Sequence, residues 1–438
     1  MLDKFFKTIE KITPAKYRWI LNHDGFKRYF ANTGWMFFGQ MFSLLVSFFI
    51  GAWIARYLGP ENYGVLNYSI AFAGLFSFIA SLGVDGILIR ELVAHPEQRD
   101  ELLGTTFRLK IIGGLIAFLL ITLSILIFKS TLLIKILTIL FASCFILQAI
   151  NVVSSYFQAE VKSKYNVKAT LVSTLISSIL KIIVILLGYG VIWIIIVYVL
   201  DFVWQWIWLV KSYQSCGLKI KAWHFNKEVA LKILKNSWPL MLASAAWFIY
   251  LRIDQVMIGA LLGNLEVGIY AAAVKLVEVW YFVPGIICGS LFPAIINAKK
   301  MGSVVYKKRL KALYLLMIAI AVFIAIVSTI LAHWIIVVLY GTAYLAAVII
   351  LKIYVWSGVG LFLGIAINQY FLSENQSHYI FFYNLLSMIT NIVLNLVLIP
   401  KIGLTGAAWA TLISYSAGPI IVLIISLFGG FKIEDNKY

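Results

Sequence analysis

Residues 245–278 read AAWFIYLRIDQVMIGALLGNLEVGIYAAAVKLVE. Two apolar runs are joined by a short turn, and each run carries two charged residues. The first run contains Arg252 and Asp254, and the second contains Lys275 and Glu278. A charge at bilayer depth costs roughly 3 kcal/mol on insertion scales, so a chain keeps it where it pairs or has a function. The stretch therefore predicts a transmembrane hairpin with charges inside the membrane.

The rest of the chain has the same apolar character. Of its 438 residues, 62% are hydrophobic and 12% are charged, and the mean hydropathy is +0.96. This composition excludes a soluble protein and predicts an all-α polytopic membrane protein, with spans long enough to cross a hydrocarbon layer of about 30 Å. We expect about 12 transmembrane helices, at 35–58, 64–84, 109–128, 133–157, 169–188, 190–210, 238–262, 267–293, 312–334, 343–368, 379–399 and 404–428.

The basic residues gather on one side of these spans. The chain has 36 Lys and Arg against 18 Asp and Glu, for a net charge of +18. Most of them lie in the N-terminal segment, the even-numbered links and the C-terminal tail, whereas the odd-numbered links hold Arg56, Lys129, Lys135 and Lys401. Because positive residues mark cytoplasmic loops, we expect both termini to be cytoplasmic. The excess charge then reflects topology and attraction to membrane lipids, and no nucleic-acid partner is expected.

A glycine pattern divides the chain into two halves. Gly59 and Gly64 recur as Gly263 and Gly268, with the same offset of 204 residues (263 − 59 and 268 − 64). Six spans return the chain to its starting side, so the repeat is parallel, with its axis along the membrane normal. We therefore expect a basic cytoplasmic segment, a lobe of spans 1–6, a cytoplasmic link, a lobe of spans 7–12 and a cytoplasmic tail, at 1–31, 32–210, 211–237, 238–428 and 429–438.

Ionisable residues within the spans are the candidate functional residues. Left facing lipid, they would together cost on the order of 20 kcal/mol, so they must face protein or a hydrated cavity. Counted from the hairpin turn, the four hairpin charges all lie near the bilayer midplane, at least about 16 Å deep. The set comprises Lys181, Asp201, Arg252, Asp254, Lys275, Glu278 and Lys352.

Two arrangements of the hairpin charges remain open. They could form two ion pairs between the helices, or some could face a cavity. Residues two apart on a helix point about 200° from each other, so we expect only one of Arg252 and Asp254 to face the next helix. Lys275 and Glu278, three apart, share a face. We favour Arg252 as the residue that faces the cavity.

The charges of this set favour an anionic ligand. Four cations against three carboxylates make a slightly cationic pocket, which suits a phosphate or diphosphate. Arg56, at the outer end of the first span, either extends this field or anchors the helix at the interface. The carboxylates Asp254, Glu278 and Asp201 are candidates for H⁺ or Na⁺ coupling or for structural pairing.

No catalytic residue, cofactor or metal site is expected. The sequence contains no phosphate-binding loop of the Walker type and no HExxH, GxSxG or CxxC motif. The three cysteines are scattered without metal-ligand spacing.

Several motifs along the chain resemble those of a known family, the Wzx-type polysaccharide flippases of the multidrug/oligosaccharidyl-lipid/polysaccharide exporter superfamily. In the first half they are NTGW at 32–35, ARYLGPE at 55–61, GVDG at 83–86 and REL at 90–92. In the second half they are YLRIDQ at 250–255, GIY at 268–270, Lys275, Glu278 and Pro284, and finally IP at 399–400 with GAAWAT at 406–411.

This resemblance implies a MATE-like fold, with two six-helix lobes around a central cavity that opens alternately to each side. It implies a non-enzymatic transporter in the prokaryotic plasma (inner) membrane. The cargo would be polyprenyl-diphosphate-linked oligosaccharide, moved from the inner to the outer leaflet for O-antigen, capsule or exopolysaccharide synthesis, in contact with polysaccharide polymerase or chain-length proteins. The family's cationic cavity matches Arg252, Lys275, Lys181 and Lys352 here.

Two other functions are alternatives to this one. A multidrug or cation exporter of the same superfamily should prefer an acidic, aromatic cavity, and the four intramembrane cations count against it. A membrane polysaccharide polymerase or ligase would need a large external loop with catalytic residues. The external links are short, for example 188–190 and 340–342, which disfavours that class.

Overall fold

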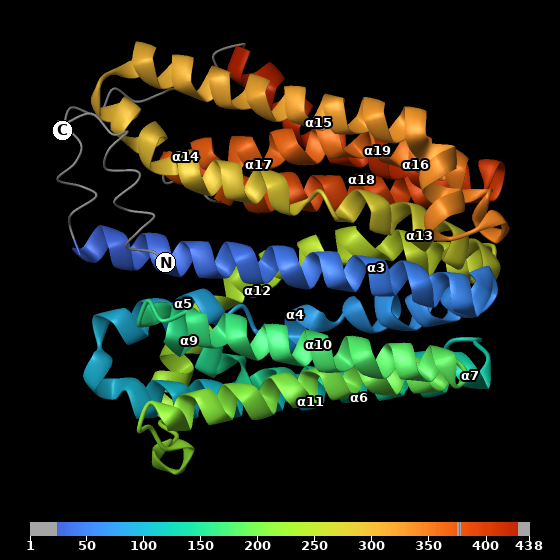
Figure 1. The fold of residues 1–438 in the computed structure, drawn as a ribbon. Coiled ribbons are helices and arrows are strands. Elements are labelled where there is room, and N and C mark those ends of the chain that lie inside the picture. Colours follow the sequence, from blue (N-terminus) through green and yellow to red (C-terminus); the bar gives the residue numbers. More distant parts are fainter. Residues whose placement is uncertain (1–23, 375, 377, 428–438) are drawn as a thin grey trace. The chain divides into compact units, whose positions relative to one another are not determined.

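The structure is a computed structural model that describes residues 24–374, 376 and 378–427. These residues form helices joined by short turns, and none of them lies in a strand (Figure 1). Ten helical segments of this described part are long and apolar enough to cross a membrane. The predicted all-α polytopic class is therefore confirmed. Most of the predicted N-terminal segment and the predicted tail at 429–438 lie outside the described residues.

Five of these ten segments of the described part lie in the first half of the chain. The first of them belongs to one long kinked helix, because Gly59 adopts a left-handed conformation (φ 70°) just before Pro60. A glycine there bends the chain without the steric cost that a side chain would bring. The elements are α3 (Asp24–Gly74), α4 (Ser77–Ser81), α5 (Asp85–Ala94), η2 (Pro96–Gln98), α6 (Arg99–Ile127), α7 (Leu132–Ala142), α8 (Cys144–Leu147), η3 (Gln148–Ile150), α9 (Asn151–Ala159), α10 (Lys164–Leu186) and α11 (Val191–Ser215).

The second half repeats this plan with different interruptions. Helix α12 begins well before the apolar run at 238, because a helix satisfies its own backbone and can continue into water. The elements are η4 (Ile220–Ala222), α12 (Lys227–Leu261), α13 (Asn264–Glu278), α14 (Phe282–Lys300), α15 (Ser303–Leu339), η5 (Thr342–Tyr344), α16 (Ala347–Tyr354), α17 (Ser357–Ser373), α18 (His378–Ile402) and α19 (Leu404–Leu427).

The helices gather into two compact units. Unit 1 comprises the residues up to 50, then 78–124 and 139–241. Unit 2 comprises 51–77, 125–138 and the residues from 242 onward. Unit 2 thus includes the turn of the first hairpin, which the sequence analysis assigned to the first lobe. The division into lobes at 210 and 238 stays a prediction.

Each unit has its own core and its own ion pairs. In unit 1 the buried side chains of α5, α9 and α11 pack together, including Leu88, Phe157 and Tyr213. Ion pairs join Lys110 to Asp85 at 2.5 Å and Lys232 to Glu91 at 2.8 Å. In unit 2, α14, α15 and α17 pack around Tyr306, Met317 and Phe371. Large apolar side chains such as Ile330 and Trp334 on α15 are exposed, as expected of a surface that faces lipid.

Candidate functional site

The charged hairpin is formed by α12 and α13, joined at Gly263, and all four of its charged residues lie in unit 2, which begins within α12 at Leu242. Helix α13 is almost fully buried from Val267 to Val277, largely because the small residues 271–273 let neighbouring helices approach closely. Lys275 is the exception on this segment, since its side chain is exposed. A long helix within the protein therefore presents one cation on an otherwise buried surface.

Arg252 forms an ion pair with Glu278. The Arg252 Nη1 atom lies 3.1 Å from Glu278 Oε1, and the two side chains are 27% and 17% exposed. The expectation that only one of Arg252 and Asp254 faces the next helix is wrong, because both contact α13. Helical periodicity sets the direction of the Cα–Cβ bond, but the long arginine side chain reaches around α12 to its partner.

Asp254 is buried and hydrogen-bonded. Its Oδ2 atom accepts a bond from the Tyr270 hydroxyl at 2.5 Å, and its Oδ1 atom accepts one from the backbone N–H of Gln255 at 2.7 Å. These donors satisfy a carboxylate that has been removed from water. Asp254 is thus held by hydrogen bonds, in contrast to the ion-paired Glu278.

The Asp254–Tyr270 hydrogen bond is the first contact of a polar network within unit 2. The Tyr270 hydroxyl lies 3.4 Å from Thr411 Oγ1, and the Asn391 amide donates to Thr411 at 3.5 Å and to Ser414 at 3.2 Å. The Asn395 amide donates to Asn391 at 2.9 Å. This network was not predicted from the sequence. Its signal was two asparagines four residues apart in the apolar run at 379–399, which share one face of a helix.

Lys275 is an intramembrane cation with no partner. Within the part of the chain that the structure describes, its ammonium makes no hydrogen bond or ion pair, and Glu278 on the same face is engaged by Arg252. Lys352 on α16 is likewise exposed, with no such contact to any described residue. Arg252 was the favoured cavity residue, but the side chain that the structure leaves available is Lys275.

Lys181 and Asp201 lie in unit 1, on α10 and α11. The Lys181 side chain is buried, and its ammonium sits 3.9 Å from the centroid of the Tyr198 ring, in a cation–π contact. Asp201 follows Tyr198 by three residues and therefore shares its face of α11. One carboxylate oxygen of Asp201, Oδ1, is buried and lacks a hydrogen-bond partner among the described residues. This pair forms a second polar locus, separate from the charged hairpin.

Arg56 makes a contact that is typical of a residue that anchors a helix. Its guanidinium donates to the backbone carbonyl of Val338 at 3.5 Å, next to the end of α15 at Leu339. A cation is favourable at the C-terminal end of a helix, where carbonyl groups lack partners. The neighbouring carbonyl of Ala55 accepts a bond from the Tyr344 hydroxyl at 2.7 Å. These contacts fasten the first hairpin within unit 2.

The two repeated glycine turns contact each other. A Cβ atom on Gly64 would lie 1.7 Å from the backbone oxygen of Asn264, and one on Gly268 would lie 1.8 Å from that of Pro60. The contact is reciprocal, because Pro60 and Asn264 are separated by the same 204 residues as the two glycines. Reciprocal contacts of this kind are what a local two-fold axis produces. Only glycine fits at either position.

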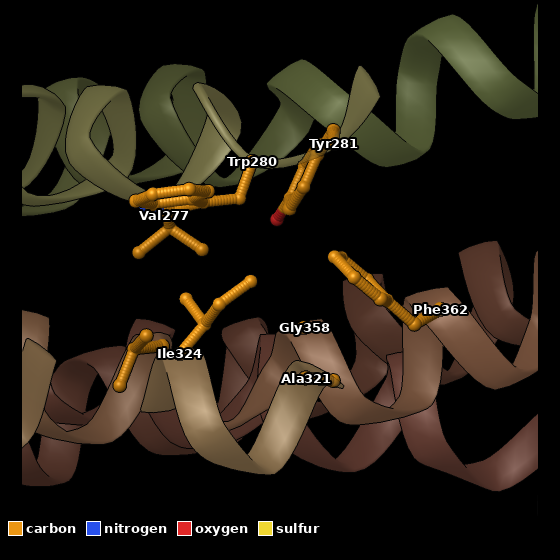
Figure 2. A pocket seen from close by; sticks show the side chains of 8 residues that line it. Val277, Trp280, Tyr281, Ala321, Ile324, Gly358 and Phe362 are labelled. Carbon is orange, nitrogen blue, oxygen red and sulfur yellow. The ribbon is translucent and has the colours of Figure 1, made fainter. Parts of the chain in front are cut away.

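A break in the second hairpin helix follows Glu278. Helix α13 ends there and α14 begins at Phe282, and a small cavity of about 10 Å³ lies beside the break. Figure 2 shows Trp280 and Tyr281 on one side of this cavity and Phe362 on the other, with the Tyr281 hydroxyl pointing into the space. The volume holds about one water molecule. Interrupted helices at membrane depth are typical of the binding regions of transporters.

Comparison with known protein families identifies the family of this chain. Residues 29–299, more than half of the sequence, match the family model described as polysaccharide biosynthesis protein. The chain belongs to this family. No functionally curated protein matches its sequence.

Solved structures share the fold of this polysaccharide biosynthesis family member at low identity. The lipid II flippase MurJ in an inward closed conformation is 17% identical, with a TM-score of 0.72 over 89% of this chain and 87% of that one. A multidrug resistance MATE family transporter of the MOP superfamily, in an inward-facing conformation, is 15% identical, with a TM-score of 0.66 over 89% and 96%. A MOP superfamily transporter from Pyrococcus furiosus is 16% identical, with a TM-score of 0.57 over 94% and 97%. These comparisons confirm the predicted MATE-like fold, and the family member is a multi-pass membrane protein.

Proposed function

We propose that this protein is an alternating-access flippase that moves polyprenyl-diphosphate-linked oligosaccharide from the inner to the outer leaflet of a prokaryotic plasma membrane, for synthesis of surface polysaccharide. The observation that carries the proposal is Lys275, an exposed cation about 16 Å along a membrane helix from its turn, with no hydrogen-bond or ion-pair partner among the described residues. Membership of the polysaccharide biosynthesis family supports the sugar cargo.

The ammonium of Lys275 favours an anionic head group. The four hairpin charges sum to zero, but Arg252 and Glu278 pair with each other and the Tyr270 hydroxyl holds the Asp254 carboxylate, so Lys275 is the hairpin cation without an ion-pair partner among the described residues. Its ammonium would form charge-assisted hydrogen bonds to a diphosphate, which are shorter and stronger than neutral ones. Lys352 would add to this field from α16, and Arg56 would have a minor role, whereas Lys181 stays a candidate binding cation of unit 1.

The Arg252–Glu278 ion pair would couple binding of the cargo to binding of the coupling ion. A diphosphate that reaches Arg252 competes with Glu278 for the guanidinium and leaves that carboxylate without its cation. An uncompensated carboxylate in a poorly hydrated site takes up H⁺ or binds Na⁺. Glu278 is thus the leading coupling residue. Asp254, with its polar network, and Asp201 are the alternatives.

Transfer across proteoliposomes tests the proposal. We expect wild-type protein to move a fluorescent polyprenyl-diphosphate trisaccharide to the opposite leaflet, and Lys275→Gln to lower kcat/KM at least tenfold. Lys275→Arg should retain most of the rate, because it keeps the charge. Lys401→Gln, at an exposed lysine at the end of α18, is the matched control and should behave as wild type.

The outcomes separate the candidate functions. Equal rates for Lys275→Gln and wild type would remove Lys275 from the site. No transfer of the lipid-linked sugar by wild-type protein, together with resistance of producing cells to cationic drugs, would instead identify a drug exporter.

A further inference from the structure

We propose that unit 2 contains a separate subsite for one neutral sugar ring of the cargo, in a cavity between α12, α17 and α18. The inference rests on the proposed function and extends it to a second binding site. The cavity has a volume of about 280 Å³. Its polar and aromatic lining comprises Trp247, Tyr250, Asn368, Tyr383 and Asn384, and two aliphatic side chains of α17 complete it.

The aromatic walls of this cavity are held in place by their surroundings. The Tyr250 ring lies against Tyr415, with the ring centroids 4.2 Å apart. The Tyr383 ring occupies a slot between two glycines. A Cβ on Gly364 would lie 2.4 Å from its hydroxyl, and one on Gly418 would lie 2.2 Å from its Cδ2 atom. Rings fixed in this way lose little conformational entropy when a ligand binds.

Two amides of the cavity lack hydrogen-bond partners. Asn384 is only 9% exposed, and its side chain forms no hydrogen bond with any described residue. The carbonyl oxygen of Asn368 is buried and is also without a partner in the described part of the chain. An asparagine amide offers donors and an acceptor together. Buried amides in this state are costly unless a ligand or water satisfies them.

The lining excludes the other components of the cargo. Among the described residues, no Lys, Arg, Asp or Glu side chain lines the cavity, so this lining offers no charge that complements a diphosphate or a cationic drug. A lipid chain would leave both amides unsatisfied in an apolar environment. A sugar ring presents an apolar C–H face to aromatic rings and hydroxyls to amides, so it satisfies both kinds of lining group.

The volume fits a single ring with its substituents. Pockets for drug-sized ligands begin at about 300 Å³, so a cavity of about 280 Å³ does not hold a complete oligosaccharide repeat. Along α12, Tyr250 precedes Arg252 by two residues, which is about 3 Å of helix rise. The subsite therefore lies at nearly the same depth as the charged hairpin, where the diphosphate is proposed to bind.

The test compares two cargoes with the full-length protein in proteoliposomes: polyprenyl diphosphate alone, and the same lipid carrying a trisaccharide. We expect Asn384→Leu to raise KM for the trisaccharide lipid about fivefold, as for one lost hydrogen bond, and to leave KM for the bare lipid unchanged. Trp247→Leu should have the same selective effect through lost ring contact. The matched controls are Phe382→Leu and Trp238→Leu, at side chains that are 59% and 57% exposed.

A direct binding measurement tests the subsite independently of transport. Saturation-transfer NMR with N,N′-diacetylchitobiose should detect contact with purified wild-type protein and a loss of signal with Asn384→Leu and Trp247→Leu. Equal KM changes for both cargoes, or unchanged binding in both variants, would overturn the subsite. Failure of wild-type protein to move either cargo would overturn the proposed function, whereas selective chitobiose binding would still support the subsite.

Discussion

The two glycine hairpins share a backbone and differ in chemistry. Both turns use a glycine with positive φ, Gly59 at 70° and Gly263 at 118°. Five residues later, Gly64 and Gly268 make their reciprocal contact. The geometry of the turn is therefore duplicated, which is expected if both halves of a repeat require the same close approach.

The charges occur in one copy only. At the same offset of 204 residues, the first hairpin has apolar or small residues where the second has its charges: Phe48 for Arg252, Ile50 for Asp254, Ala71 for Lys275 and Gly74 for Glu278. A Cβ atom on Gly74 would lie 3.8 Å from Arg252 Cγ, so the position equivalent to Glu278 packs beside its partner arginine. The repeat therefore supplies the same backbone scaffold twice, and only the second hairpin carries charges at these positions.

The largest effect is expected where the hairpins are identical. Gly268→Ala places a Cβ 1.8 Å from a backbone oxygen, which no side-chain rotation can relieve, so the hairpins must separate. We expect a loss of about 3 kcal/mol in unfolding free energy and of most transfer activity. Thermal unfolding in detergent measures the first, and the proteoliposome assay measures the second.

Gly51→Ala is the control for this prediction. A Cβ there meets nothing within 4 Å, so the variant should unfold like wild type. If Gly268→Ala keeps wild-type stability and rate, the reciprocal contact has no structural importance.

A smaller effect is expected where the hairpins differ by a charge. Glu278→Gln leaves Arg252 with an uncompensated charge, which costs 3–5 kcal/mol in a fully buried pair. Since the arginine is 27% exposed, we expect about 2 kcal/mol. The exchanged pair Arg252→Glu with Glu278→Arg should recover part of this loss in a double-mutant cycle. Additive single effects would show that the pair contributes no coupling energy.

The hydrogen bond to Asp254 should have a still smaller effect. Tyr270→Phe keeps the ring and removes the donor, so the buried carboxylate loses one of its two bonds. We expect a loss of about 1.5 kcal/mol in unfolding free energy. In the first hairpin the equivalent position is Leu66, which packs with no polar group to satisfy. Leu66→Met should therefore cost less than Tyr270→Phe, and the reverse order would show that packing, rather than the hydrogen bond, decides stability here.

How much the sequence predicts can be judged from these same residues. Apolar length and glycine spacing predicted the helical class and the two turns, because hydrophobic thickness and positive φ are local requirements. The role of the hairpin charges as a binding site stays a prediction. Their pairing was not predicted, because helical periodicity gives the direction of Arg252 but neither its reach nor the position of Glu278. The cavity around Asn384 could not be predicted, since the consecutive helices α17 and α18 form it together with α12, which is distant in the chain.

The smallest effect on stability is expected for a carboxylate–cation pair outside the membrane segments. This effect can be compared with that of the Arg252–Glu278 pair in the hairpin. Glu91 on α5 accepts a hydrogen bond from Lys232 at 2.8 Å, and this bond lowers its pKa below the ordinary value of 4.5, with Arg90 contributing and burial opposing. A lowered folded-state pKa means that the stabilisation is fully present above about pH 4.5 and is lost as the pH falls through the folded-state pKa. Because Lys232 is 58% exposed, the contribution should stay below about 1 kcal/mol. Unfolding midpoints measured from pH 7 down to pH 3 should fall less for Glu91→Gln than for wild type. Identical pH profiles would show that this pair, unlike Arg252–Glu278, adds nothing to the fold.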